Sequence, residues 1–357
     1  MHSKEHYDIV LDIGRMEPCH LGHTTNIKES LKYGDHVLIL LGSAFQPRTP
    51  KNPFTHQERT KMLRTVVGDN PRVSIRPIRD YLYSDNKWIE GVQATVDELI
   101  KELDIKKPKS EIKIAILGHE KDESSYYLRI FPNWKFIDIG PYAEIGGKVI
   151  DATRIRQLYF EGHFDFIKGV LDSGVYQFLL EFSKTKEYAQ VKEEYDFYKK
   201  YKKQWENSPY PVQFNCADAV VVQGGHILLV QRKSSPGKGL WALPGGFINE
   251  NETSENAAIR ELMEETKIKV SENVLRKSIV HKHTKLFDHP NRSLRGRTFS
   301  MAYLIELTSG DPALPKVKGS DDALTAKWFT LSEVSGMSEF LFDDHYSIIM
   351  HMAQRLG

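Results

Sequence analysis

Short apolar runs alternate with amphipathic stretches through the first half of the chain. The runs are YDIVLDI (7–13), HVLILLGS (36–43), RVSIRPI (72–78), IKIAILG (112–118) and KFIDIG (135–140). Helix-like segments begin near Leu21, His56, Trp88 and Ser124. This alternation predicts an α/β domain in which helices wrap a parallel sheet. Ligands of such sheets bind beyond the carboxyl ends of the strands, so GRMEPCHLGH (14–23), directly after the first run, occupies the position of a site.

The second half has a different pattern. Strand-like stretches at 215–223, 225–233 and 297–307 surround one strong helix at about 253–266, and a second helix lies near the C-terminus. This pattern favours a mixed sheet sandwiched between helices. The length of 357 residues also favours two domains.

A charged segment separates the two patterns. Residues 184–205, KTKEYAQVKEEYDFYKKYKKQW, combine helix-forming charges with aromatics at near-helical spacing, and the breaker NSPYP follows. We interpret the segment as a solvated linker helix whose aromatic side docks on one domain. The predicted boundaries are therefore a first domain at 1–183, a linker at 184–208 and a second domain at 209–357.

Composition narrows the class of protein. A net charge of +1 provides no general attraction to nucleic acid or membrane, so neither is expected as a partner. Two cysteines are too few for a disulfide framework, which favours a reducing, cytoplasmic location. No run approaches the roughly 20 apolar residues that span a bilayer, and the N-terminus lacks the pattern of a secretory signal.

The strongest chemical signal lies in residues 246–268, GFINENETSENAAIRELMEETKI. Helical spacing places Glu261, Glu264 and Glu265 on one face, with Glu252 just upstream. Like charges arranged in this way repel, whereas a hard divalent cation binds such oxygen ligands. The cluster therefore predicts a site for Mg²⁺ or Mn²⁺.

This segment resembles the Nudix box, G-x5-E-x7-R-E-U-x-E-E-x-G-U, in which U is aliphatic. One position departs, because Lys267 replaces the late glycine, which we expect to serve the turn after the helix. The resemblance implies hydrolysis of a nucleoside diphosphate linked to another group, with Arg260 orienting Glu261. It implies catalytic roles for Glu261, Glu264 and Glu265, and metal binding by Gly246, Glu252, Glu261, Glu264 and Glu265.

Two further segments, 287–304 and 321–329, look like parts of Nudix enzymes that act on ADP-ribose. Arg292, Arg295 and Arg297 in the first are candidates for binding substrate phosphates, and a solvated turn is the alternative. Asp321 and Asp322 in the second are candidates for a base or a further ligand, with turn capping as the alternative.

In the first domain, His20 and His23 stand at the predicted start of a helix. Free backbone N–H groups and the helix dipole favour an anion there, and Gly22 lets a phosphate approach the backbone. Both rings can donate hydrogen bonds to phosphate. A metal site is the competing hypothesis, but no third ligand is apparent from the sequence.

The stretch GRMEPCHLGH is similar to the G-R-F-Q-P-F-H-x-G-H run of archaeal-type nicotinamide-mononucleotide (NMN) adenylyltransferases. NPFTHQER (52–59) and IDATRIR (150–156) resemble two other motifs of that family. Glu17 replaces a glutamine, and Asp151 replaces a serine near ATP; its charge would repel ATP unless the side chain turns away to cap the following helix. The resemblance implies catalytic His20, His23 and Arg156, and an ATP site of Gly14, Arg15, Gly22, Gly118, Asp122, Thr153 and Arg156.

The acceptor nucleotide is expected at DYLYSDNKWIEGV (80–92). By resemblance, Trp88 stacks on nicotinamide and Asn86 pairs with the carboxamide. A core tryptophan at a helix start is the alternative.

Together these matches resemble a bifunctional family that joins a Rossmann-like nucleotidyltransferase domain with a parallel sheet to a Nudix α/β/α sandwich with a mixed sheet. The resemblance implies transfer of AMP from ATP to NMN, giving NAD and pyrophosphate, and hydrolysis of ADP-ribose to AMP and ribose 5-phosphate, with Mg²⁺ or Mn²⁺ in both domains. The alternatives are another mononucleotide acceptor, such as nicotinate mononucleotide, and a Nudix domain that senses ADP-ribose without hydrolysing it. The oligomeric state stays open, a homo-oligomer included.

Overall fold

The computed structural model describes residues 5–120, 123–140, 144–145, 148–149, 151–308 and 313–356. The chain divides into two compact units, Met1–Lys192 and Glu193–Gly357. The division lies inside the segment 184–208, which the sequence predicts as the linker. Each unit has its own sheet and its own hydrophobic core.

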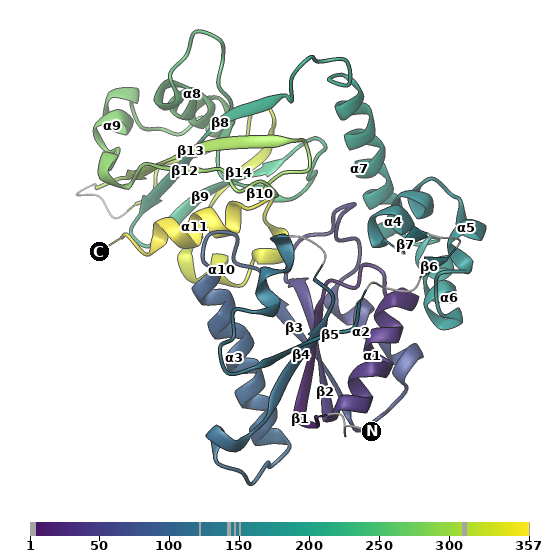
Figure 1. Cartoon of the computed structure of the whole chain (residues 1–357). Coiled ribbons are helices and arrows are strands. Elements are labelled where there is room, and N and C mark those ends of the chain that lie inside the picture. The colour runs from purple at the N-terminus through teal and green to yellow at the C-terminus, as the bar shows by residue number, and fades with distance from the viewer. Residues whose placement is uncertain are drawn as a thin grey trace. The chain divides into compact units, whose positions relative to one another are not determined.

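The first unit is built on five parallel strands (Figure 1). They are β1 (Tyr7–Gly14), β2 (Gly34–Ala44), β3 (Val73–Arg79), β4 (Ile114–Gly118) and β5 (Lys135–Asp138). Their order is β3-β2-β1-β4-β5. The chain adds β2 and β3 on one side of β1 and then β4 and β5 on the other, and we call the point between β1 and β4 the winding reversal. A crevice for ligands forms at the carboxyl ends of the strands at such a reversal, which is where GRMEPCHLGH lies.

Helices cover both faces of this sheet. They are α1 (Leu21–Tyr33), α2 (His56–Val67) and α3 (Asp85–Glu102). Alternate residues of β1 point to opposite faces: Ile9 joins the cluster that contains Val92 and Val96 of α3, whereas Val10 joins the cluster that contains Tyr33 of α1. Both faces are therefore buried, which explains the nearly continuous apolar runs of the sequence.

Small elements complete the first unit. They are the 3₁₀ turns η1 (Lys109–Glu111) and η2 (Glu123–Leu128), the strands β6 (Glu144–Ile145) and β7 (Lys148–Val149), and the helices α4 (Ala152–Phe160), α5 (Phe164–Lys168) and α6 (Ser173–Phe182). The helix expected near Ser124 is therefore only a 3₁₀ turn. Aromatic rings join α4 to α6 through Phe54, which lies 6.4 Å from Tyr159 and 5.0 Å from Phe182 between ring centroids.

The predicted linker forms helix α7 (Lys186–Lys203). Its aromatic side does not dock on a single unit. In the first unit, the ring of Tyr188 lies 5.1 Å from Tyr159 and 5.8 Å from Phe160; in the second, Tyr201 lies 5.7 Å from Phe214. The expectation of one docking partner is wrong, because the aromatics of the segment recur over several turns and contact aromatic rings of each unit.

The second unit contains a mixed sheet. Its strands are β8 (Gln213–Gln223), β9 (His226–Arg232), β10 (Trp241–Ala242), β11 (Gly245–Phe247), β12 (Lys285–Phe287), β13 (Arg297–Glu306) and β14 (Ala323–Thr330). β13 runs parallel to β8, and the other pairings are antiparallel. This confirms the predicted mixed sheet.

Helices lie on opposite sides of this sheet, with α8 on one side and α11 on the other (Figure 1). The helical segments are α8 (Ser254–Thr266), α9 (Glu272–Lys277), η3 (His281–His283), α10 (Leu331–Ser335), η4 (Ser338–Phe340) and α11 (His345–Ala353). α8 buries Ala257, Ala258, Ile259 and Leu262 against β8, β9 and β13. This apolar stripe fixes the rotation of the helix and so turns its carboxylates toward β11.

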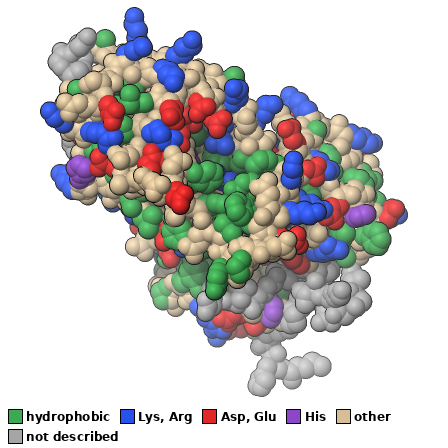
Figure 2. All heavy atoms as spheres, turned by 90° about the horizontal axis from the view of Figure 1, so that it is seen from above, with side chains coloured by type: hydrophobic (Ala, Val, Ile, Leu, Met, Phe, Trp, Pro, Cys, Tyr) green, Lys and Arg blue, Asp and Glu red, His purple; other side chains and the backbone are tan. Residues whose placement is uncertain are grey.

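Acidic and basic side chains are interspersed over the face seen in Figure 2, as a net charge of +1 suggests. Within the described parts of the chain, every helix is too short or too polar to span a bilayer.

The core contact of α8 provides a stability test. Leu262 is fully buried, so Leu262→Ala should lower the free energy of unfolding by about 2–5 kcal/mol. Val274→Ala is the control, because that side chain is 48% exposed and should cost less than about 0.5 kcal/mol. Urea unfolding of both variants measures the difference, and similar midpoints would contradict the assignment of Leu262 to the core.

Candidate functional site: two nucleotide sites

His20 and His23 form the N-terminal cap of α1. The Nδ1 atom of His20 accepts a hydrogen bond from Gly22 N at 3.2 Å, and Nδ1 of His23 accepts one from His20 N at 3.3 Å. This arrangement is a capping box built from imidazoles. The predicted helix start is thus confirmed, and the histidines occupy its first turn.

The caps also determine which ring nitrogen of each histidine carries the proton. Because Nδ1 of His20 and of His23 accepts a backbone N–H, the neutral rings carry their protons on Nε2. The two ring centroids lie 3.9 Å apart at an interplanar angle of 33°. Paired Nε2–H donors at a helix start are suited to an anionic ligand.

Three cations from separate segments influence one another at this site. Burial, together with the charges of Arg15 and Arg156, lowers the pKa of Lys51 to about 8. Burial, reinforced by Arg15, also lowers the pKa of Arg156, to about 10. A polyphosphate would relieve this repulsion. The sequence analysis missed Lys51, and its place directly before the NPFT motif was the signal available.

Arg156 binds directly to the segment 15–20, between β1 and α1, which we call the histidine loop. Its Nη1 donates to the Glu17 carbonyl at 2.6 Å and its Nη2 to Thr153 Oγ1 at 3.2 Å. Asp151 caps α4 by accepting Thr153 N at 3.0 Å. The capping expected for Asp151 is therefore confirmed, and the Thr153 amide is already bonded to it.

Glu17 is buried rather than facing the site. Its Oε2 accepts Phe54 N at 3.1 Å, and its Oε1 lies 3.2 Å from Arg59 Nε, with both side chains 1% exposed. Burial raises the pKa of Glu17 to about 7, against the opposing charge of Arg59. Glu17 therefore ties the histidine loop to α2.

The remaining candidates of the first unit follow the ends of β3 and β4. Trp88 is half-buried beside Tyr127 and Phe131, each 6.1 Å away between ring centroids, and Asn86 is exposed in the first turn of α3. Gly118 ends β4, at the winding reversal. Asp122 lies outside the described residues.

In the second unit, Arg260 organises the carboxylates of the box. Its Nε lies 2.8 Å from Glu252 Oε1, and its Nη1 lies 2.8 Å from Glu261 Oε1 and 3.1 Å from Glu264 Oε2. Arg260 thus orients Glu261, as the resemblance implied. It also binds Glu252 and Glu264.

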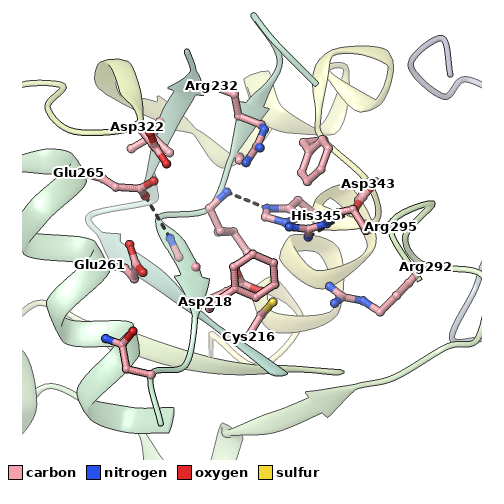
Figure 3. Close-up of a pocket in the computed structure, with 18 residues that line it drawn as sticks. Cys216, Asp218, Arg232, Glu261, Glu265, Arg292, Arg295, Asp322, Asp343 and His345 are labelled. Carbon is pink, nitrogen blue, oxygen red and sulfur yellow. Dashed lines mark hydrogen bonds and ion pairs between the residues drawn. The ribbon is translucent and has the colours of Figure 1, made fainter. Parts of the chain in front are cut away.

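Glu261 and Glu265 face a pocket of about 260 Å³ (Figure 3). Glu265 Oε2 accepts Gly245 N at 3.1 Å, and burial raises the pKa of this carboxyl to about 8. A Cβ atom at Gly246 would collide with the Glu261 carboxylate, so only glycine permits this approach.

A divalent cation fits Glu261 and Glu265. Its charge would offset the cost of burying two carboxylates and the repulsion between them. The predicted set is not gathered in full, since Glu252 and Glu264 bind Arg260 instead of lining the pocket. No group of three or more acidic, His or Cys side chains within the described ranges is arranged as a complete metal site, at the histidine pair or here.

Two of the three predicted arginines reach the pocket. Arg292 lines it while forming a buried two-bond ion pair with Asp344, at 2.8 and 2.9 Å, and Arg295 stacks over Phe247 at 5.2 Å. Arg297 does not line the pocket; it begins β13 and donates to the Asp288 carbonyl. The structure therefore does not support Arg297 as a residue that contacts substrate in this pocket.

The opposite wall contains residues that the sequence analysis missed. Arg232, Asp343 and His345 lie across from Glu261 and Glu265 (Figure 3). Burial lowers the pKa of His345 to about 3, so the ring is neutral, and its Nδ1 accepts Leu243 N at 2.9 Å. These residues belong to no short motif. Asp322 also lines the pocket, whereas Asp321 does not.

Comparisons with known proteins identify a different family in each half of the chain. Residues 11–133 match the cytidylyltransferase-like family and residues 214–352 match the NUDIX domain. A nicotinamide/nicotinic acid mononucleotide adenylyltransferase of Acinetobacter baylyi is 35% identical over 53% of this chain and 94% of its own length. An ADP-ribose pyrophosphatase of Methanocaldococcus jannaschii is 34% identical over 37% of this chain and 68% of its own.

Solved structures match almost the whole chain, and we describe one of them. It is a bifunctional NMN adenylyltransferase/ADP ribose pyrophosphatase from Francisella tularensis complexed with AMP and a Mn ion. It is 35% identical, covers 98% of this chain and 100% of its own, and has a TM-score of 0.86. The two folds and their sites define a nucleotidyltransferase and a Nudix hydrolase within one chain. The chain belongs to the bifunctional NMN adenylyltransferase/ADP-ribose pyrophosphatase family.

Glu17 generates a pH prediction. Because burial raises its folded pKa from 4.5 to about 7, its stabilising contribution is complete below pH 4.5 and is lost as the pH rises through 7. Relative to Glu17→Gln, the wild-type free energy of unfolding should therefore fall by at most about 3 kcal/mol over that range. Urea unfolding across pH measures this fall. The exposed Glu98→Gln is the control, and parallel curves for wild type and Glu17→Gln would contradict the prediction.

Proposed function

We propose that the first unit transfers AMP from ATP to NMN, giving NAD and pyrophosphate, and that the second hydrolyses ADP-ribose to AMP and ribose 5-phosphate. The observation that carries the first activity is the convergence of two Nε2–H donors and three cations at the winding reversal of the sheet. The observation that carries the second is a pocket with Glu261 and Glu265 on one wall and arginines on the other.

In the transferase reaction, a 5′-phosphate oxygen of NMN forms a bond to the α-phosphorus of ATP, and the bond from that phosphorus to the β-phosphate bridging oxygen breaks. Negative charge moves onto the departing pyrophosphate. His20 and His23 donate from Nε2, while Arg15, Lys51 and Arg156 provide positive charge. These mainly cationic side chains do not fit a protein-bound metal, so we derive no step through Mg²⁺ in this unit.

In the hydrolase reaction, water attacks one phosphorus of the pyrophosphate and the other phosphate leaves. Glu261 and Glu265 would hold a divalent cation, which supplies charge neutralisation and acidifies water when bound. Arg232 and Arg295 bind phosphate oxygens from the opposite wall, and Arg292 supports that wall through Asp344.

The acceptor preference of the transferase is part of the proposal. Trp88 and Asn86, after the end of β3, are our candidates for the nicotinamide ring and its carboxamide. NMN and nicotinate mononucleotide differ at that group, so pyrophosphate release with each acceptor and ATP distinguishes them. We also propose a cytoplasmic location, which the two free, buried cysteines support.

The transferase is tested by His23→Ala. The variant should keep ATP affinity within roughly tenfold and lose about a hundred- to a thousandfold in turnover, because the donor acts mainly in the transition state. The exposed His6→Ala is the control, and thermal unfolding reports any loss of the cap. Near-normal turnover in His23→Ala would overturn the assignment.

The hydrolase is tested by Glu265→Gln, with the exposed Glu250→Gln as control. Release of AMP from ADP-ribose with Mg²⁺ should fall by about a hundredfold or more, since the loss of a ligand charge weakens metal-dependent stabilisation worth several kcal/mol. If wild-type protein binds ADP-ribose but releases no AMP, the sensor alternative is correct instead.

A further inference from the structure

We propose that Glu194, in the linker helix α7, is a positioning residue of the hydrolase pocket and acts through Arg232. This inference rests on the proposed ADP-ribose hydrolysis. No motif indicates Glu194, because it lies between the two domains predicted from the sequence. The structure places it in the second unit.

Glu194 is bonded to the loop between β9 and β10. Its Oε1 accepts the backbone N–H of Gly237 at 2.6 Å. Gly237 has a φ of +72°, and a Cβ atom there would collide with the ring of Phe342. The loop backbone is therefore held between a carboxylate of α7 and an aromatic ring of the pocket.

The same loop binds Arg232, whose Nε donates to the Pro236 carbonyl at 2.7 Å. This carbonyl and the Gly237 N–H that Glu194 accepts belong to one peptide group. The Arg232 guanidinium also lies 4.1 Å from the centre of the Phe342 ring. Two contacts thus fix the guanidinium at the pocket wall (Figure 3), and one of them depends on the loop that Glu194 holds.

The neighbouring charges support this role. Burial raises the pKa of Glu194, while the hydrogen bond from Gly237 N and the charge of Arg232 act to lower it, so the carboxyl interacts with both groups. Tyr198, one turn further along α7, is buried; burial raises the pKa of its hydroxyl, the charge of Glu194 raises it further, and the charge of Arg232 acts to lower it. This part of α7 therefore backs the cationic wall of the pocket rather than lying in solvent.

A shift in the position of a phosphate-binding arginine should change KM for the substrate more than it changes kcat. Glu194→Ala leaves Gly237 N without its acceptor and removes the bond that links the loop to α7. A lost hydrogen bond of this kind corresponds to roughly three- to tenfold in affinity. We expect KM for ADP-ribose to rise by about that factor with kcat within about twofold.

The experiment compares Glu194→Ala, Glu194→Gln and the exposed neighbour Glu193→Gln in the full chain. Gln retains an acceptor oxygen for Gly237 N, so Glu194→Gln should have a KM close to that of the wild type. The KM of Glu193→Gln should not differ from that of the wild type. Thermal unfolding of the same preparations verifies that the second unit, which contains Glu194, is folded in each variant. Equal KM in wild type and Glu194→Ala, or an equal rise in the Ala and Gln variants, would overturn the proposal.

A double-mutant cycle tests the route through Arg232. Glu194→Ala should raise KM in the wild type but add little in an Arg232→Ala background, because the group that it positions is then absent. Additive effects would overturn the route. If wild-type protein hydrolyses no ADP-ribose, the proposed function fails instead, so the two failures are distinguishable.

Discussion

Repulsion between like charges held close together is the constraint on which both sites depend. In the first unit, burial, reinforced by Arg15 and Arg156, lowers the pKa of Lys51 to about 8. In the second, burial, reinforced by Glu261, raises the pKa of Glu265 to about 8. Holding like charges together costs each unit folding free energy, and a ligand of opposite sign recovers part of it. The cations of the first site are suited to phosphates, whereas the second site has carboxylates for a cation on one wall of its pocket and arginines on the other.

The fold around these charges explains why they gather. The winding reversal lies between β1 and β4, and the segment 14–20 that follows β1 leads there into α1. In the second unit, the apolar stripe of α8 sets the rotation of that helix, so Glu261 and Glu265 turn toward β11. Both sites follow from how a helix packs on a sheet, although one uses the helix start and the other uses a helix face.

Sequence alone predicted whatever depends on local spacing. The apolar runs predicted both sheets, the GRMEPCHLGH stretch indicated His20, and the Nudix box indicated Glu261. Lys51 and Arg232 were missed because neighbours distant in sequence bring them to the sites, and no period in the chain encodes those contacts. Arg297 lies only two residues from Arg295, yet it begins a strand and faces elsewhere. Lys267, which replaces the late glycine of the Nudix box, adopts the left-handed conformation that favours glycine. The replacement therefore affects the turn after α8.

The imidazole caps of α1 have a consequence for any anionic ligand at this helix start. Each ring is held by a main-chain N–H at Nδ1, so its rotamer and its tautomer are set before a ligand binds. The entropy of ordering the two rings is lost once, during folding, and would not be lost again at each binding event. Secondary structure itself therefore pre-organises the pair.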